Sequence, residues 1–324
     1  MNILPGDQQA ALAGAVVVPT GQPFRRPLRH RVPDHALVVA TGAAAALVVV
    51  ILGVILTDIV IHGAPALTLS FLVESPSKGM TAGGIFPAIF GTVALVILMT
   101  MAVVPVGVAT AIYLQEYASP RSRFTRAVRV AIANLAGVPS IVFGLFGLGF
   151  FVQFVGVGVD KVFYEGQRVF GQPALVWAAL TLAVLTLPVV IVATEEALRS
   201  IPRETREASM ALGATRFQTV FRVAVPQALP GILTGTILAV SRGAGEVAPI
   251  LFTGAAYYLP GLPTRLHDQF MELGYHVYVM STQAPDVDAT APLLYATVIV
   301  LLVLTFLLNL AAVLVRSRIR RRSP

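Results

Sequence analysis

The chain has 324 residues, of which 56% are hydrophobic and only 12% are charged. Its mean hydropathy is +0.81, and the charged share is about half that of an average soluble protein. This composition excludes a water-soluble globule, a disordered chain and a coiled coil. The formal net charge is +7 and the sequence contains no cysteine, which excludes a disulfide framework, thiol chemistry and cysteine-ligated metal sites.

Six apolar runs are long enough to cross a bilayer, which takes roughly 20 apolar residues. They lie at 36–57, within 79–115, at 130–159, at 169–194, from 223 to about 254, and at 289–315. Because lipid cannot hydrogen-bond an open backbone, we expect each run to be helical. The sequence therefore predicts an all-α polytopic membrane protein with six transmembrane helices. Only the fifth run is interrupted by charged residues, Arg242 and Glu246.

The basic residues between these runs are distributed asymmetrically. Eighteen of the 23 lie in the segments on one predicted side: Arg25, Arg26, Arg29, Arg31, Arg121, Arg123, Arg126, Arg129, Arg199, Arg203, Arg206, Arg216, Arg222, Arg316, Arg318, Arg320, Arg321 and Arg322. The other side has only Lys78, Lys161, Arg168 and Arg265. The positive-inside rule therefore places both termini in the cytoplasm, as an even number of spans requires. Membrane topology, rather than nucleic-acid binding, accounts for the basic excess.

These patterns divide the chain into four segments. We expect residues 1–34 to form a cytoplasmic tail, 35–62 the first transmembrane helix, 84–315 a core with the other five helices, and 316–324 a basic cytoplasmic tail. The first apolar run is too long, and starts too far into the chain, to be a cleaved signal.

The sequence carries no pattern for catalysis. Its two lysines, Lys78 and Lys161, do not follow a glycine, so the Walker A lysine that reaches nucleotide phosphates is missing. The five histidines form no H-E-x-x-H motif. We therefore expect a non-catalytic transport or channel subunit that has no metal or cofactor of its own and receives any driving energy from elsewhere.

The loop after the fourth run, about 195–228, has the signals of two short helices. Pro202 suits a first helical turn, and Gly213 suits the left-handed position that follows a helix. Thr215 and Gln218 form a capping box for a second helix, and Pro226 marks entry to the fifth span. Two interpretations remain open: a compact knob that docks into a groove of a partner, or an ordinary amphipathic connector.

The same loop resembles the EAA loop of ABC importer permeases, E-A-A-x3-G-x9-I-x-L-P. Glu207 and Ala208, then Gly213, then the segment 223–226 that ends in a proline, stand at the family's spacing. Ser209 replaces the second alanine, and two valines replace the isoleucine and leucine. The resemblance extends from about residue 84 to residue 310 and implies the type I ABC importer permease fold.

In that family the loop sits in a cleft of a cytoplasmic ATPase and transmits its movement to the spans. The resemblance therefore implies that Glu207, Ala208 and Gly213 are contact or turn residues for ATPase coupling. It implies that Pro226 sets the angle at which the chain enters the fifth span.

Arg242 is the most informative residue of the fifth run. An ionised side chain at membrane depth normally faces a cavity or a partner. Glu246, one helical turn later, can pair with it, and Ser241 can add a hydroxyl donor. Two interpretations are possible: a substrate site for an anion, because the planar guanidinium matches phosphate oxygens, or a structural Arg–Glu pair.

Small residues also recur at every fourth position of this run: Gly231, Gly235, Ala239 and Gly243. Such a stripe allows helices to approach closely. It serves either to line a pathway shared with a second permease or to pack the bundle.

The segment 241–253, Ser-Arg-Gly-Ala-Gly-Glu-Val-Ala-Pro-Ile-Leu-Phe-Thr, is similar to the fifth-span motif of phosphate-specific transport (Pst) permeases, and favours the PstA-type subunit. Segments 105–117 and 137–145 look like permease core segments, and 273–278 resembles an outer PstA-type region. The resemblance implies one subunit of an ATP-driven phosphate importer in a bacterial or archaeal inner membrane.

The implied partners are a PstC-type permease, two copies of a PstB-type ATP-binding subunit that holds ATP and Mg, and an extracytoplasmic PstS-type phosphate-binding protein. Membrane lipid surrounds the chain, and no nucleic acid is involved. Two alternatives remain: a permease for another oxyanion such as molybdate or sulfate, and a transporter or channel that works without ATP.

Overall fold

A computed structural model describes residues 31–77, 82–259, 261–284 and 286–322. The chain divides into two compact units, residues 1–57 and 58–324. The first unit, as far as it is described, consists of most of helix α2 (Arg31–Gly63), whose apolar side chains are exposed. Of the predicted tail 1–34, residues 1–30 lie outside the described residues, while residues 31–34 are already helical.

The second unit contains the end of α2 and all later elements. In chain order these are the 3-10 turn η2 (Ala64–Ala66), α3 (Leu69–Val73), β1 (Pro76–Ser77), β2 (Ala82–Gly83), α4 (Phe86–Ile112), the π-helical η4 (Tyr113–Tyr117), α5 (Arg123–Leu135), α6 (Ser140–Phe146), the π-helical η5 (Gly147–Gly156), α7 (Val157–Phe163), α8 (Leu175–Arg199), α9 (Arg203–Ala211), α10 (Arg216–Thr219), the π-helical η6 (Val220–Ala224), α11 (Val225–Gly243), α12 (Ile250–Thr253), α13 (Leu273–Thr282) and α14 (Val287–Arg322). The two strands form a small antiparallel pair, with Pro76 opposite Gly83.

Six helices of the described residues are long and apolar enough to span a membrane, which confirms the predicted number. They are Ala36–Ala66, Phe86–Tyr117, Ser140–Phe163, Leu175–Arg199, Arg216–Gly243 and Val287–Arg318. The chain is therefore an all-α multi-pass membrane protein. The basic tail predicted at 316–324 continues α14 as far as Arg322.

The predicted boundaries of the third and fourth spans were wrong. The run 130–159 is divided at Gly137 and Pro139 between the amphipathic α5 and a continuous helix formed by α6, η5 and α7. The fourth span begins at Leu175 rather than 169, after a loop with glycines and a proline. In both cases the apolar run continues across turn-forming residues that interrupt the helix.

The fifth span also differs from the prediction, because its helix ends at Gly243 and not near residue 254. Gly245 and Pro249 lie in the segment that follows, and α12 is a separate short helix. Consequently Arg242 occupies the last turn of α11, and Glu246 lies beyond the helix.

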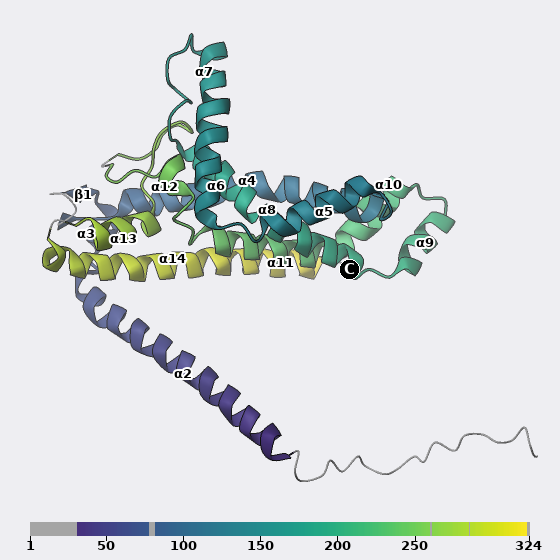
Figure 1. Ribbon diagram of the computed structural model, residues 1–324, viewed down its shortest axis with the longest axis horizontal. Coiled ribbons are helices and arrows are strands. Elements are labelled where there is room, and N and C mark those ends of the chain that lie inside the picture. Colours follow the sequence, from purple (N-terminus) through teal and green to yellow (C-terminus); the bar gives the residue numbers. More distant parts are fainter. Residues whose placement is uncertain (1–30, 78–81, 260, 285, 323–324) are drawn as a thin grey trace, which may run out of the picture. The chain divides into compact units, whose positions relative to one another are not determined.

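Helices α4, α8, α11 and α14 run alongside one another, and α6, η5 and α7 cross them (Figure 1). Helix α8 is the most buried of the spans, and it packs against both α4 and α11. The central core includes Met99, Leu182 and Val190, all fully buried. The position of the fifth span is therefore fixed by the packing of α11 against the central helix α8.

The small-residue stripe of α11 faces this central helix. Gly231 packs against Ala197 of α8, and Gly235 packs against Ala193. Gly243 packs directly against the side chain of Met99 in α4. The stripe thus serves close packing within the bundle, which is the second of its two predicted uses.

Candidate functional site

The two short helices predicted in the loop 195–228 are present as α9 and α10, and we call residues 203–219 the elbow. Gly213 follows α9 with φ of +90°, and its N–H donates to the Met210 carbonyl at 2.9 Å while Ala214 N–H donates to the Ser209 carbonyl at 3.3 Å. This pair of bonds is the Schellman arrangement that closes a helix. The predicted capping box of α10 is also formed, with the Gln218 N–H 3.2 Å from Thr215 Oγ1.

Two arginines attach the elbow to the end of the second span. The Arg206 guanidinium of α9 makes two contacts with the Glu116 carboxylate of η4, at 2.7 and 3.3 Å. Two more of its donors bond the Leu198 and Ile201 carbonyls at 2.7 Å each. Arg216 of α10 donates to the Glu116 carbonyl. Since the Glu116 and Arg206 side chains are only 9% and 16% exposed, this is a largely buried joint held by charge-assisted hydrogen bonds.

The outer surface of the elbow, together with the segment that follows it as far as Pro226, is open. The four residues predicted for ATPase coupling are all exposed, as are four large apolar side chains near them: Glu207, Ala208, Gly213 and Pro226, with Met210, Leu212, Phe217 and Phe221. Leu212 is 90% exposed. Within the described part of the chain, the Glu207 carboxylate makes no hydrogen bond or ion pair. Exposed apolar side chains on a rigid turn are typical of a surface that inserts into a partner.

Arg242 lies about halfway along the bundle. Its neighbour Gly243 packs against Met99, in the middle of α4, and lies near Thr186, in the middle of α8. The helix therefore ends at mid-depth, which is a feature of transporter substrate sites. A cation in the last turn also opposes the partial negative charge of the helix C-terminus.

Two predicted neighbours of Arg242 have different surroundings. Arg242 Nε lies 3.5 Å from Glu246 Oε1, and their side chains are 42% and 22% exposed. The Ser241 hydroxyl instead donates to the Asn309 amide oxygen of α14 and to the Ile237 carbonyl. The structure thus brings Arg242 and Glu246 together, while it directs Ser241 toward the sixth span.

A groove of about 960 Å³ runs between α4 and α11. At the elbow its lining includes Tyr117 and Phe221, and farther along it includes Thr236 and Thr100. Because Thr100 follows Met99, the groove extends to about the level of Gly243. Its walls are mainly apolar, and its lining includes neither Arg242 nor Glu246.

A different buried acid, Glu272, lies at the opposite end of the bundle, where α13 begins. Its carboxylate accepts from the Gly274 and Tyr275 N–H groups at 2.8 and 2.7 Å, and Thr92 Oγ1 lies 3.4 Å away. Complete burial raises the pKa of Glu272 to about 7, against these hydrogen bonds. Burial also lowers the pKa of nearby His276 to about 4.

The sequence did not single out several residues that prove central here. Glu116 closes an apolar run and its partner is 90 residues away, so no local pattern identifies it. The same holds for Glu195, which pairs with Arg129 at 3.0 Å. Asn309 was not singled out either, although an amide within the apolar run 289–315 is a signal that could have identified it.

The comparisons with known proteins agree with this architecture. Residues 103–321 match the family described as the binding-protein-dependent transport system inner membrane component. The chain is 34% identical to the probable ABC transporter permease protein YqgI of Bacillus subtilis, over 88% of this chain and 95% of that protein. It is also 34% identical to the phosphate transport system permease protein PstA 1 of Mycobacterium tuberculosis, over 75% of this chain and 73% of the relative.

Solved structures show the same fold. The chain superposes on a permease of a bacterial alginate ABC transporter with a TM-score of 0.64 at 16% identity, covering 89% of this chain and 96% of that one. The MetNI methionine ABC transporter gives a TM-score of 0.54 at 19% identity, with 72% and 94% covered. By sequence and by fold, the chain belongs to the inner-membrane permeases of ABC importers, in which PstA phosphate permeases are among its relatives.

Proposed function

We propose that this chain is the PstA-type permease subunit of an ATP-driven phosphate importer. It forms the translocation pathway with a PstC-type permease and receives phosphate from an extracytoplasmic PstS-type protein. Of the importer's two PstB-type ATPases, one binds at its elbow, which lies on the cytoplasmic side with both termini. Support comes from the PstA relatives, and from the excess of arginines at the elbow end of the bundle.

The elbow is suited to mechanical coupling. Its helices are joined by a rigid left-handed turn at Gly213, and the Arg206–Glu116 contact attaches it to the second span. An ATPase that holds Glu207 and the exposed apolar side chains can therefore move two spans at once. The chain itself contributes no catalysis: ATP and Mg belong to the partner.

Arg242 is the residue that carries the phosphate assignment. A guanidinium that remains 42% exposed at the end of a helix halfway along the bundle offers a transient bidentate site for an oxyanion. Glu246 competes for the same charge, which keeps affinity modest and permits release. Ser241 contributes by fixing the end of α11 against Asn309. Alternating access of the two permeases would then expose this site to each side in turn.

Phosphate uptake by the reconstituted four-component system tests this assignment. Arg242→Gln is expected to abolish uptake while all subunits still co-purify, because the substitution removes the charge without removing a packing contact. Arg265→Gln is the matched control, since it removes an exposed loop arginine and should leave uptake unchanged. Normal uptake in Arg242→Gln would contradict the proposed role of Arg242.

The same preparation separates the alternatives. Competition with molybdate and sulfate identifies the oxyanion, and uptake that is indifferent to phosphate would reject the phosphate assignment. Glu207→Lys should lose the ATPase on co-purification, whereas Glu204→Lys, also exposed on α9, should retain it. A chain that never binds a Walker-bearing ATPase would instead be a transporter or channel that works without ATP.

A further inference from the structure

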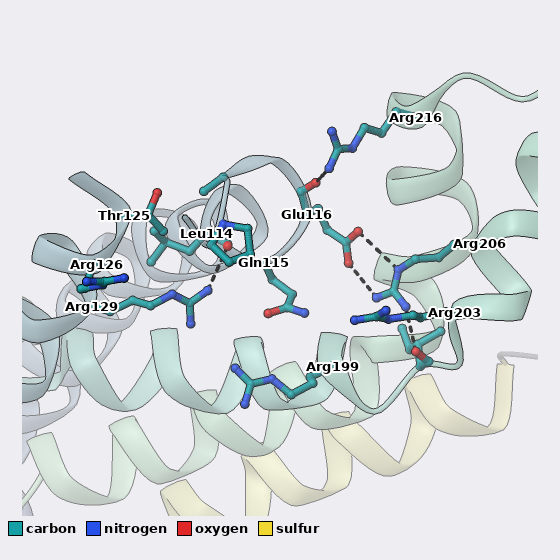
Figure 2. Close-up of a pocket in the computed structure, with 13 residues that line it drawn as sticks. Leu114, Gln115, Glu116, Thr125, Arg126, Arg129, Arg199, Arg203, Arg206 and Arg216 are labelled. Atoms are coloured by element: carbon teal, nitrogen blue, oxygen red, sulfur yellow. Dashed lines mark hydrogen bonds and ion pairs between the residues drawn. The ribbon is translucent and has the colours of Figure 1, made fainter. Parts of the chain in front are cut away.

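A second pocket, of about 640 Å³, lies where the elbow meets the rest of the bundle. Its walls come from η4, α5, the end of α8, α9 and α10, and six of its lining residues are arginines: Arg126, Arg129, Arg199, Arg203, Arg206 and Arg216. Figure 2 shows Arg129 reaching in from one side and Arg203 and Arg206 from the other, with the Gln115 amide between them. One acid, Glu116, lines the same space.

Three of these arginines are already engaged. Arg206 is bound to the Glu116 carboxylate. Arg129 bonds Glu195 and the Leu114 carbonyl, both at 3.0 Å. Arg216 donates to the Glu116 carbonyl and lies over the Tyr117 ring. The carboxylates of Glu116 and Glu195 are therefore used by two of the six cations.

The guanidinium groups of the other three, Arg126, Arg199 and Arg203, make no hydrogen bond or ion pair with the residues that the structure describes. Arg199 is within electrostatic range of Glu195, which Arg129 already contacts. Like charges held around one space repel each other, and the arrangement is stabilised when an anion enters it. The pocket thus has an uncompensated positive charge on three separate elements.

Neutral donors in the wall are also unused. Thr125 lines the pocket, is only 4% exposed, and its hydroxyl makes no hydrogen bond in the described part of the chain. The Gln115 amide lines the same space and is likewise without a hydrogen bond there. A hydroxyl or an amide in the wall of a basic pocket is a donor that a ligand oxygen can use. Several donors around one pocket match a tetrahedral group with multiple oxygens better than a single planar carboxylate.

We propose that this pocket binds a phosphate group, either inorganic phosphate or the headgroup of an anionic phospholipid. The ligand bridges Arg126 and Arg199 of the bundle to Arg203 of the elbow. A bound phosphate therefore restrains the elbow against α5 and α8, and its release frees the elbow to move. This site is separate from the proposed transport site at Arg242, and it does not depend on phosphate being the transported ion.

The test uses the full chain with Arg242→Gln as background, so that the proposed transport site cannot contribute to phosphate binding. Inorganic phosphate is titrated calorimetrically onto this protein in phosphatidylcholine nanodiscs, with ionic strength held by chloride. The pocket variant adds Arg199→Gln and Arg203→Gln. The matched control adds Arg123→Gln and Arg222→Gln, which remove two exposed arginines outside the pocket. Size-exclusion profiles establish that both are folded.

The pocket variant is expected to bind phosphate about tenfold more weakly or worse than the control, because two charged hydrogen-bond donors are lost. Nanodiscs that contain phosphatidylglycerol distinguish the two sources. If the lipid headgroup occupies the pocket, two results are expected. Phosphatidylglycerol abolishes the binding of inorganic phosphate to the control variant, and more phosphatidylglycerol remains bound to the control than to the pocket variant. If inorganic phosphate is the ligand, its binding persists in that lipid. Equal phosphate binding and equal lipid retention by the two variants would overturn the proposal.

Discussion

Buried carboxylates are handled differently at the two ends of the bundle. At the elbow end, Glu116 is paired with Arg206 and Glu195 with Arg129, so that two cations from distant segments balance them. At the opposite end, Glu272 makes no ion pair with any described residue and is held by two backbone N–H groups and Thr92. The ion pairs join elements that can separate, whereas the hydrogen bonds to Glu272 fix the start of one local helix. Burial raises the pKa of Glu272 to about 7 in spite of those hydrogen bonds.

The largest effect on stability is expected from substitution of Glu116 at the elbow end. Glu116→Gln leaves the Arg206 charge largely buried without its carboxylate, at an expected cost of about 3 kcal/mol. We expect a lower apparent melting temperature in detergent, together with uptake that no longer follows ATP hydrolysis. Glu204→Gln, an exposed acid on α9, is the control and should change neither. If the double variant Glu116→Gln/Arg206→Gln is destabilised by the sum of the two single effects, the residues are not coupled.

At the opposite end of the bundle, the buried side chains of Glu272 and His276 are expected to make stability depend on pH in opposite directions. The pKa of Glu272 is raised from 4.5 to about 7, so its stabilising contribution is full below pH 4.5 and is lost as the pH rises toward 7. The pKa of His276 is lowered from 6.5 to about 4, so its contribution is full above pH 6.5 and is lost as the pH falls toward 4. In the native protein these two slopes largely cancel.

Single substitutions separate the slopes. From pH 5 to 7, the apparent melting temperature should rise in Glu272→Gln and fall in His276→Gln, each by an amount equivalent to on the order of 2 kcal/mol. Only the slope is compared, because the substitutions also change local packing. Parallel pH profiles for the two variants would contradict the assignment of these pKa shifts to burial at the two positions.

The smallest expected effect concerns the turn within the elbow. Gly213→Ala places a side chain at φ of +90°, at a local cost of about 1 kcal/mol. No atom would lie within 4 Å of the added Cβ, so the cost is conformational rather than steric. Co-purification with the ATPase should weaken, and Gly213→Asn should weaken it less because asparagine tolerates this region better. Unaltered association in both variants would show that the turn geometry is not required.

Local signals predicted the elements well. The capping box at Thr215 and the glycine at 213 placed the elbow correctly, because caps and left-handed turns depend on nearest neighbours along the chain. The six spans were found for a similar reason, since length and apolarity are sufficient. Their ends were less predictable: apolar residues continue past Gly243 into a segment whose glycines and proline do not extend the helix.

The contacts that connect the elements could not be predicted. Glu116 and Arg206 each look like an ordinary charged residue near a helix end, and their pairing depends on how α9 folds back toward η4. Helix α5 was missed because its arginines interrupt the apolar pattern. The predicted pair of Arg242 and Glu246 was recognisable because the two residues are close in sequence, although the helix ends between them.

The π-helical turn η4, which carries Glu116, has a consequence for how force divides in this molecule. A displaced elbow pulls on the fifth span through covalent bonds, which cannot yield. It pulls on the second span through the contacts of Arg206 and Arg216 with Glu116, which are non-covalent and can break. These non-covalent contacts therefore transmit small movements of the elbow and break under large ones. The second and fifth spans need not move the same distance in one transport cycle.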